Sequence, residues 1–186
     1  RQRQMGIRDS ILGKQKGYEV FVSDKGAIKT SYKDVLLNND IEFEEHTHTA
    51  SKILNADLVM KSPGIPDKAP VVKELKDKGI SVISEIEFAA QYTAASIIGI
   101  TGSNGKTTTT LLCHHILKAA NLSAGVAGNI GDSFAQQVAE NDFDLFVLEL
   151  SSFQLDGIIR FAPHIAILTN ISPDHLDRYD YDYDKY

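Results

Sequence analysis

A glycine-rich segment in the middle of the chain has the residue types that cradle phosphate. Residues 101–107 are Thr-Gly-Ser-Asn-Gly-Lys-Thr, and they lie between the apolar run 97–100 and a helical stretch. Backbone N–H groups of small residues can point at phosphate oxygens, and the positive end of the following helix adds to the attraction. The lysine can reach the terminal phosphates and the threonine can ligate Mg²⁺. The segment therefore predicts a site for ATP and Mg²⁺.

The residues that we expect to bind the nucleotide are those of this loop and the first helical turn. They are Gly102, Ser103, Asn104, Gly105, Lys106, Thr107 and Thr108. The general P-loop motif has another glycine five residues before Gly105, where this chain has Ile100, with Gly99 one residue earlier. A glycine-rich turn that only caps a helix is the alternative. The strand before the loop, the Gly-Lys-Thr triplet and the helix after it favour phosphate binding.

Two further side chains follow apolar strands of the second half and are candidates for a metal site. Glu149 closes the apolar run 145–148, and a carboxylate at the carboxyl end of a strand can hold Mg²⁺. His175 follows the next strand, in a Ser-Pro-Asp-His sequence, and a neutral imidazole can join oxygen ligands around a metal. An exposed loop histidine is the alternative. Beside Glu149 and Lys106, His175 is favoured as a residue of the site.

Other polar residues give weaker signals. The loop Gly-Asn-Ile-Gly at 128–131 permits close backbone approach around the amide of Asn129, which both donates and accepts, so it is either a substrate clamp or a plain turn. The His-x-His pair at 46–48 has no further ligands nearby in the sequence, and we expect surface residues there. His114 and His115 are adjacent on a predicted helix and cannot share a face, which disfavours a joint ligand role.

The order of elements around these residues predicts an α/β fold. In the first half we expect a helix at 11–16, a strand at 18–24, a strand at 57–60, a helix at 68–78, a strand at 80–84 and a helix at 85–92. In the second half we expect strands at 97–100, 124–126, 145–150 and 165–171, with helical stretches between them. Strands that alternate with helices in this way build a parallel, doubly wound sheet.

The same pattern predicts two domains. We expect an incomplete Rossmann-like domain over 11–94 and part of a P-loop-type central ATP-binding domain, with a mainly parallel sheet, over 95–186. Residues 1–10 provide neither the hydrophobic strand nor the Gly-x-Gly with which such a domain usually opens, so we expect a leader foreign to the fold. The sequence stops shortly after the Ser-Pro-Asp-His motif, and we interpret the chain as a fragment.

Composition excludes several classes of protein. No apolar run approaches the roughly 18 to 20 residues that span a bilayer, and no secretory signal peptide is recognisable. A net charge of -6 argues against a nucleic-acid partner, because phosphate neutralisation needs a surplus of Lys and Arg. The single Cys113 cannot form an internal disulfide, which agrees with a reducing compartment. We therefore expect a cytoplasmic monomer without membrane insertion.

Four motifs in order resemble those of the Mur ligase family. They are residues 99–109, 128–131, 149–155 and 170–179, and the resemblance covers 11–186. Residues 62–66, Ser-Pro-Gly-Ile-Pro, also resemble the N-terminal domain of that family. The sequence Glu-Leu-Ser-Ser-Phe-Gln-Leu at 149–155 points to the branch that joins D-glutamate to UDP-N-acetylmuramoyl-L-alanine in peptidoglycan precursor synthesis.

The resemblance implies a reaction and a set of contacts. In that family ATP phosphorylates the carboxylate of the UDP-linked substrate, and an amine then attacks the acyl phosphate to give an amide and phosphate. Lys106 would neutralise charge on the transferring phosphoryl group, while Thr107, Glu149 and His175 would hold two Mg²⁺ ions. The resemblance thus implies that Lys106 and His175 are catalytic. The residues that match substrate-contacting positions of the family are Asn129, Ser151 and Gln154 for the muramoyl-alanine part, Ser62, Pro63 and Gly64 near the uridine diphosphate, and Asp24 at the uracil end.

The chain also departs from the family pattern. The family's opening strand and glycine-rich uridine-diphosphate loop should precede residue 11, and its modified lysine and C-terminal domain should follow residue 186, so we expect little or no turnover by this chain alone. Another ATP-dependent carboxylate–amine ligase, such as a different Mur ligase or folylpolyglutamate synthase, is one alternative function. A non-catalytic P-loop nucleotide-binding module is a second. A dinucleotide-binding oxidoreductase is a third, without the Gly-x-Gly-x-x-Gly that would support it.

Overall fold

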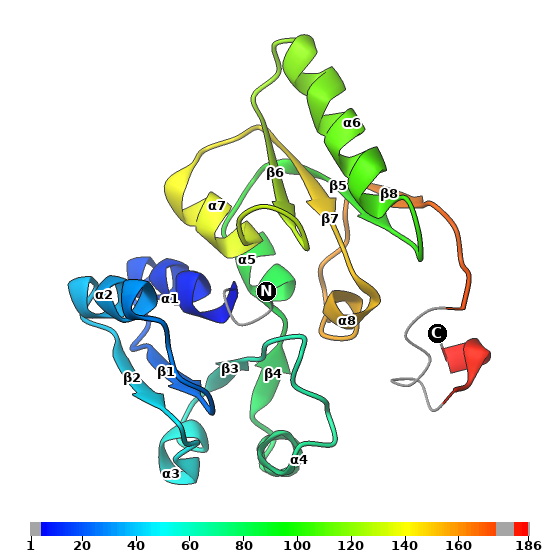
Figure 1. Ribbon diagram of the computed structural model, residues 1–186. Helices are drawn as coiled ribbons and strands as arrows, with labels where there is room; N and C mark the ends of the chain where they lie inside the picture. Colours follow the sequence, from blue (N-terminus) through cyan, green and yellow to red (C-terminus); the bar gives the residue numbers. More distant parts are fainter. Residues whose placement is uncertain (1–4, 174–180, 186) are drawn as a thin grey trace. The chain divides into compact units, whose positions relative to one another are not determined.

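The computed structural model describes residues 5–173 and 181–185, and the chain forms two compact units (Figure 1). Unit 1 consists of the described residues up to Thr93 together with 133–141 and 157–161. Unit 2 consists of 94–132, 142–156 and the described residues from Ala162 onward.

Unit 1 contains two parallel strand pairs. β1 (Phe21–Asp24) pairs with β2 (Glu42–Glu45), and β3 (Leu58–Met60) pairs with β4 (Ser81–Ile83). Its helices are α1 (Met5–Gln15), α2 (Thr30–Asn38), α3 (Ala50–Ile53), α4 (Pro70–Asp77), α5 (Glu85–Ala90) and α7 (Phe134–Glu140). The helix predicted at 11–16 therefore begins earlier, at Met5, whereas the strand predicted at 18–24 is shorter.

Local sequence signals explain several element ends in unit 1. The chain leaves α1 through Gly17 and α4 through Gly79, whose φ angles of 85° and 72° favour glycine. Pro70 begins α4, a position that needs no N–H donor. A core of Ile28, Tyr32, Leu36 and Ile41, to which Val20, Val22 and Phe43 add, packs α2 against β1 and β2.

Unit 2 is built on a four-stranded parallel sheet with strand order β6-β7-β5-β8. The strands are β5 (Ser96–Thr101), β6 (Ala124–Gly128), β7 (Leu145–Glu149) and β8 (Ile165–Leu168). The other elements are α6 (Lys106–Ala119), α8 (Ser152–Leu155) and the 3-10 helix η3 (Tyr183–Lys185). All observed strand pairs in both units are parallel, so the predicted α/β class is confirmed.

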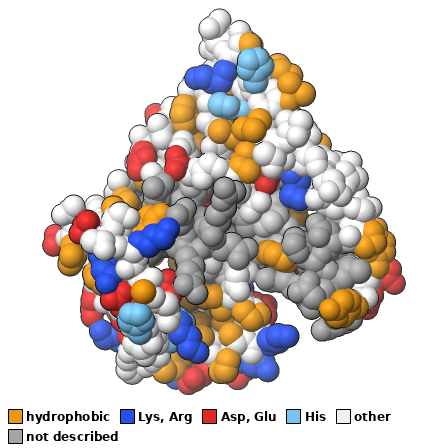
Figure 2. Space-filling model, in the orientation of Figure 1, with side chains coloured by type: hydrophobic (Ala, Val, Ile, Leu, Met, Phe, Trp, Pro, Cys, Tyr) orange, Lys and Arg blue, Asp and Glu red, His pale blue; other side chains and the backbone are white. Residues whose placement is uncertain are grey.

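Helix α6 lies along one face of this sheet (Figure 1). Cys113 and Leu117 of α6 pack on Ile98, Ile100 and Val147, so one stripe of the helix is partly buried. Another stripe is exposed. Figure 2 shows hydrophobic side chains over the outer part of α6, and the exposed ones include Leu111, Leu112 and Ile116.

The register of the sheet brings the carboxyl ends of its strands together. Ile100 pairs with Glu149, Gly128 also pairs with Glu149, and Thr101 pairs with Leu168. The loops that leave β5, β6, β7 and β8 therefore start from one edge of unit 2, which is where parallel α/β sheets bind ligands. No helix in the described ranges has the length and apolar character needed to cross a membrane.

Candidate phosphate and metal site

The carboxylate of Glu149 is the centre of the candidate site. Its side chain is buried, and the hydroxyl of Thr107 donates to Oε2 across 2.7 Å. The amide of Asn129 donates to Oε1, also across 2.7 Å, and the Asn129 backbone N–H donates to the Glu149 carbonyl across 2.8 Å. Three predicted residues, from the first turn of α6, the loop after β6 and the end of β7, thus lie in direct contact.

A glycine makes this contact possible. Gly128 has a φ of 102°, and a Cβ at that position would overlap the carbonyl oxygen of Glu149 and lie 3.2 Å from its carbonyl carbon. Only a residue without a side chain allows the β6 backbone to approach β7 so closely. The Gly-Asn pair therefore sets the distance at which the Asn129 amide meets the carboxylate.

The residues around Glu149 fit a magnesium ion in their chemistry. Mg²⁺ prefers oxygen ligands, and beside a nucleotide it typically takes one or two protein ligands together with phosphate oxygens and waters. The Thr107 hydroxyl and the Glu149 carboxylate are two such oxygen ligands, already adjacent. No group of three His, Cys, Asp or Glu side chains with metal-site geometry occurs among the residues that the structure describes. His175, the third predicted ligand and a predicted catalytic residue, lies outside the described residues.

Lys106 begins α6 and is folded over its own loop. Its Nζ donates to the carbonyl of Gly102 across 2.5 Å and to that of Ser103 across 2.9 Å. Gly105, with a φ of 83°, is the N-cap of the helix. The first N–H groups of a helix have no intrahelical acceptor, so those of Lys106, Thr107 and Thr108 are available to an anion. The ammonium group and these N–H groups together form an electropositive end of unit 2.

Ser151 and Gln154 lie at the start of α8, just after β7. The Oε1 atom of Gln154 accepts from the Ser151 backbone N–H across 3.0 Å and from its hydroxyl across 3.1 Å. The Nε2 atom of Gln154 is buried and has no hydrogen-bond partner. A buried amide donor without an acceptor is costly, so this group is suited to a carbonyl or hydroxyl of a ligand.

The predicted uridine-diphosphate residues lie in unit 1. Asp24 ends β1, and its carboxylate accepts from the Gly26 N–H across 2.7 Å. Ser62, Pro63 and Gly64 form a turn after β3 in which the Ile65 N–H donates to the Ser62 carbonyl. These residues lie in unit 1, while the candidate phosphate and metal residues lie in unit 2.

Lys61 is a residue of this region that sequence reasoning missed. Its Nζ donates to the Ile65 carbonyl across 2.6 Å and lies 3.2 Å from the carboxylate of Asp67, so it spans the Ser-Pro-Gly-Ile-Pro loop. The ammonium groups of Lys76 and Lys61 lower the pKa of Asp67 against the opposing effect of burial. The sequence signal was a lysine directly before the loop with an aspartate six residues later.

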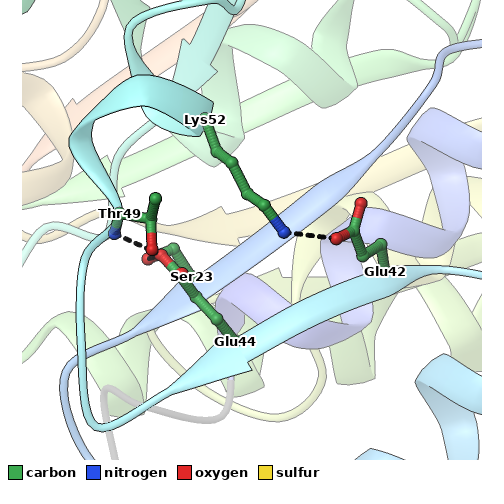
Figure 3. Close-up of polar contacts among 5 residues, drawn as sticks. All are labelled: Ser23, Glu42, Glu44, Thr49 and Lys52. Atoms are coloured by element: carbon green, nitrogen blue, oxygen red, sulfur yellow. Dashed lines mark hydrogen bonds and ion pairs between the residues drawn. The ribbon is translucent and has the colours of Figure 1, made fainter.

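The carboxyl ends of β1 and β2 carry a second polar cluster that sequence reasoning missed (Figure 3). Glu44 Oε1 accepts from the Ser23 hydroxyl and from the Thr49 N–H, each across 2.7 Å. Burial alone would raise the pKa of Glu44, but the hydrogen bonds from Thr49 and Ser23 lower it below its ordinary value. Figure 3 also shows Lys52 paired with Glu42 across 2.5 Å. The Ser23 hydroxyl also lies 2.6 Å from His48, so that histidine is part of this cluster, while His46 is exposed.

Family models match both halves of the chain. The Mur ligase middle domain matches residues 100–186, which hold the phosphate loop and Glu149. The chain belongs to the Mur ligase family. Within that family, residues 7–71 match the MurD N-terminal domain.

Curated relatives agree with this assignment. A UDP-N-acetylmuramoylalanine--D-glutamate ligase from Christiangramia forsetii is 63% identical over 97% of this chain and 41% of its own length. One of the same name from Bacteroides thetaiotaomicron is 58% identical over 95% of this chain and 40% of its own length. The chain thus spans about two fifths of the length of these relatives.

Solved structures share the fold. A UDP-N-acetylmuramate:L-alanyl-gamma-D-glutamyl-meso-diaminopimelate ligase from Neisseria meningitides matches 94% of this chain and 60% of its own, with a TM-score of 0.60 and 21% identity. A UDP-N-acetylmuramate-alanine ligase from Thermotoga maritima matches 97% of this chain and 43% of its own, with a TM-score of 0.58 and 23% identity. At these identities the likeness concerns the fold alone.

Proposed function

We propose that this chain is part of an ATP-dependent ligase that joins D-glutamate to UDP-N-acetylmuramoyl-L-alanine in the cytoplasm. In the complete reaction, the terminal phosphoryl group of ATP passes to the substrate carboxylate, and ADP leaves. The amine of D-glutamate then attacks the carbonyl carbon of the acyl phosphate, and phosphate departs as the amide forms. The names of the curated relatives support the choice of substrates.

One observation carries the proposal. The Glu149 carboxylate links the Thr107 hydroxyl of the phosphate loop to the Asn129 amide of the Gly-Asn-Ile-Gly loop. A nucleotide-binding module alone needs the first contact but has no need for the second. The second contact connects the nucleotide site to a loop that, by family resemblance, meets the muramoyl-alanine substrate, as phosphoryl transfer between two bound molecules requires.

Each residue then has a defined task. Lys106 exchanges the carbonyls of Gly102 and Ser103 for phosphate oxygens when ATP binds. Thr107 and Glu149 hold Mg²⁺, which supplies charge neutralisation on the transferring group. Asn129 and Gln154 orient the carboxylate substrate through their amides. Ser62 to Gly64 and Asp24 receive its uridine diphosphate part.

Calorimetric titration tests the nucleotide part of the proposal. The 186-residue chain is titrated with a non-hydrolysable ATP analogue in the presence of Mg²⁺. Lys106→Ala is expected to weaken binding about tenfold or more, because hydrogen bonds to charged groups contribute about 1.5–3 kcal/mol. Lys118→Ala removes an exposed ammonium from the last turn of the same helix and is the matched control. Equal losses of affinity in the two variants would mean that Lys106 acts only through the net charge of the chain. That outcome would contradict its role in binding phosphate oxygens.

A second titration tests the substrate. UDP-N-acetylmuramoyl-L-alanine is expected to bind the wild-type chain and to bind Asn129→Ala more weakly, whereas the exposed Asn141→Ala keeps the wild-type affinity. UDP-N-acetylmuramate and dihydrofolate are the comparison ligands for the sister ligases and for folylpolyglutamate synthase. Preference for either one over UDP-N-acetylmuramoyl-L-alanine would overturn the substrate assignment and leave the phosphate site intact.

A further inference from the structure

The segment that follows β8 is bonded along its length to the phosphate loop. The Thr169 N–H donates to the Thr101 carbonyl and the Ser103 N–H donates to the Asn170 carbonyl, each across 3.0 Å. The Ser103 hydroxyl donates to the Ser172 carbonyl across 2.8 Å and accepts from the Ser172 N–H across 2.9 Å. The pairing of β5 with β8 therefore continues beyond the strand ends, and residues 169–172 form a backing strip behind the loop.

Side chains of the backing strip bind the backbone of one loop residue, Asn104. The side chain of Asn170 accepts from the Asn104 N–H across 3.0 Å and donates to the Asn104 carbonyl across 2.8 Å. The Thr169 hydroxyl lies 2.7 Å from the same carbonyl and 3.1 Å from the Thr101 carbonyl, so its shorter hydrogen bond is to Asn104. Both backbone groups of Asn104 are therefore held by side chains of the strip, and its carbonyl receives two donors.

Gly102 allows the strip to come this close. A Cβ on Gly102 would overlap the Thr169 hydroxyl and lie 2.8 Å from the Asn170 carbonyl oxygen. Its φ of 131° is also one that residues with side chains rarely adopt. The first glycine of the loop is thus needed for contact with the strip, which is a different requirement from space for a phosphate.

Holding the Asn104 carbonyl also fixes the direction of the next N–H. The carbonyl of Asn104 and the N–H of Gly105 belong to one planar trans peptide, in which they point in opposite directions. Because Thr169 and Asn170 draw the carbonyl toward the strip, the Gly105 N–H is turned away from it. A peptide flipped the other way would present the carbonyl oxygen to the anion and repel it.

We infer that Thr169 and Asn170 are positioning residues for nucleotide binding, which hold the Asn104–Gly105 peptide so that its N–H faces the phosphates. The inference rests on the proposed function for the identity of the ligand. It assigns to Thr169 and Asn170 a role that acts through the backbone of Asn104. The N–H groups of Ser103 and Asn104 are both bonded to the backing strip, whereas the N–H of Gly105 is directed away from it.

Paired substitutions separate this role from a general effect on folding. Thr169→Val removes the hydroxyl and keeps the branched shape, whereas Thr169→Ser keeps the hydroxyl. Asn170→Ala removes both contacts to Asn104. The readouts in the 186-residue chain are the Gly105 amide resonance in ¹H–¹⁵N spectra without nucleotide, the dissociation constant of the non-hydrolysable ATP analogue with Mg²⁺, and the unfolding midpoint.

Thr169→Val and Asn170→Ala are expected to shift the Gly105 resonance and to weaken nucleotide binding by roughly three- to tenfold, the equivalent of one lost hydrogen bond. Thr169→Ser is expected to restore both values. Wild-type values of the resonance and the dissociation constant in both variants would overturn the inference, as would a lower unfolding midpoint without a change in affinity. If the wild-type chain binds no nucleotide, the proposed function fails for this chain. An unshifted Gly105 resonance in Asn170→Ala then overturns the positioning role separately.

Discussion

The Thr107 hydroxyl and the Glu149 carboxylate lie 2.7 Å apart, although 42 residues separate them in the sequence. Parallel pairing of β5 with β7 creates this contact, because it places the end of β7 beside the loop that leaves β5. Each oxygen of the buried carboxylate already has a donor, Thr107 on one side and Asn129 on the other. A metal ion that binds Glu149 must therefore displace these donors or share the carboxylate oxygens with them.

This arrangement predicts how metal and nucleotide binding are coupled. In Glu149→Gln the charge is lost and the volume is kept, so the Mg²⁺-dependent gain in nucleotide affinity is expected to fall at least about tenfold, as the loss of a charged partner implies. Affinity measured in EDTA is expected to stay close to the wild-type value. Titration of a fluorescent ATP analogue with and without Mg²⁺ measures both quantities.

The matched control for this prediction is Glu140→Gln. Glu140 is an exposed carboxylate at the end of α7, where it accepts from the Gln136 amide. An equal loss of Mg²⁺ dependence in Glu140→Gln would mean that general charge, and not the carboxylate at the end of β7, controls the metal. A wild-type Mg²⁺ dependence in Glu149→Gln would remove Glu149 from the metal site.

The parts of the fold that could be predicted share strong local signals. The strands β5 and β7 are apolar runs bounded by glycine or by polar residues, and the position of Glu149 follows directly from the end of β7. β2 was not predicted, because its sequence is Glu-Phe-Glu-Glu and only Phe43 is apolar. Pairing with β1 stabilises this strand, and that pairing joins segments separated by α2 in the sequence.

Some residues of the candidate site could likewise be predicted from the sequence, and others could not. The glycine loop, Lys106 and Thr107 could be found from local spacing, since each acts through its neighbours along the chain. The role of Thr169 could not, because it depends on β8 lying next to β5, and strand order is not encoded in any local pattern.

Glu87 anchors a loop within unit 1. Its buried carboxylate accepts from the backbone N–H groups of Ile159, Arg160 and Phe161, at 2.9 to 3.1 Å. Glu87→Gln keeps the size but places an amide donor against these N–H groups. We expect the free energy of unfolding to fall by about 1–3 kcal/mol at neutral pH, measured by urea unfolding. Glu74→Gln, at a side chain that is 51% exposed, is the control and is expected to change little.

The pH dependence gives an independent check on Glu87. Burial would raise its pKa, but the N–H groups of Ile159, Phe161 and Arg160 outweigh this and lower it below the ordinary 4.5. A lowered pKa in the folded state stabilises the protein above pH 4.5, and that stabilisation is lost as the pH falls through the folded value. The wild-type chain should therefore lose more stability than Glu87→Gln on acidification below pH 4.5. Parallel acid curves for the two proteins would exclude the anchor.

A pair of buried carboxylates in unit 1 predicts the opposite trend at higher pH. Asp9 of α1 and Glu85 of α5 are both buried, and one oxygen of each has no hydrogen-bond partner. Burial raises the pKa of Glu85 from 4.5 to about 7, although the N–H groups of Ala135 and Phe134 oppose the shift. Burial and the charge of Glu85 raise the pKa of Asp9, while a hydrogen bond from Ser133 lowers it.

Raised acid pKa values mean that the folded state binds more protons than the unfolded state. The stabilisation from the protonated carboxyl groups is complete below the unfolded pKa of Glu85 and is lost as the pH rises through about 7. Glu87 is already ionised in this range and contributes no change. The unfolding midpoint of the wild-type chain should therefore fall between about pH 5 and pH 8. Asp9→Asn removes one buried charge and should flatten this fall and raise the midpoint at the higher pH, whereas the exposed Asp57→Asn should follow the wild type. A midpoint in Asp9→Asn that falls as steeply as in the wild type would show that the two carboxylates do not share a buried, proton-binding environment.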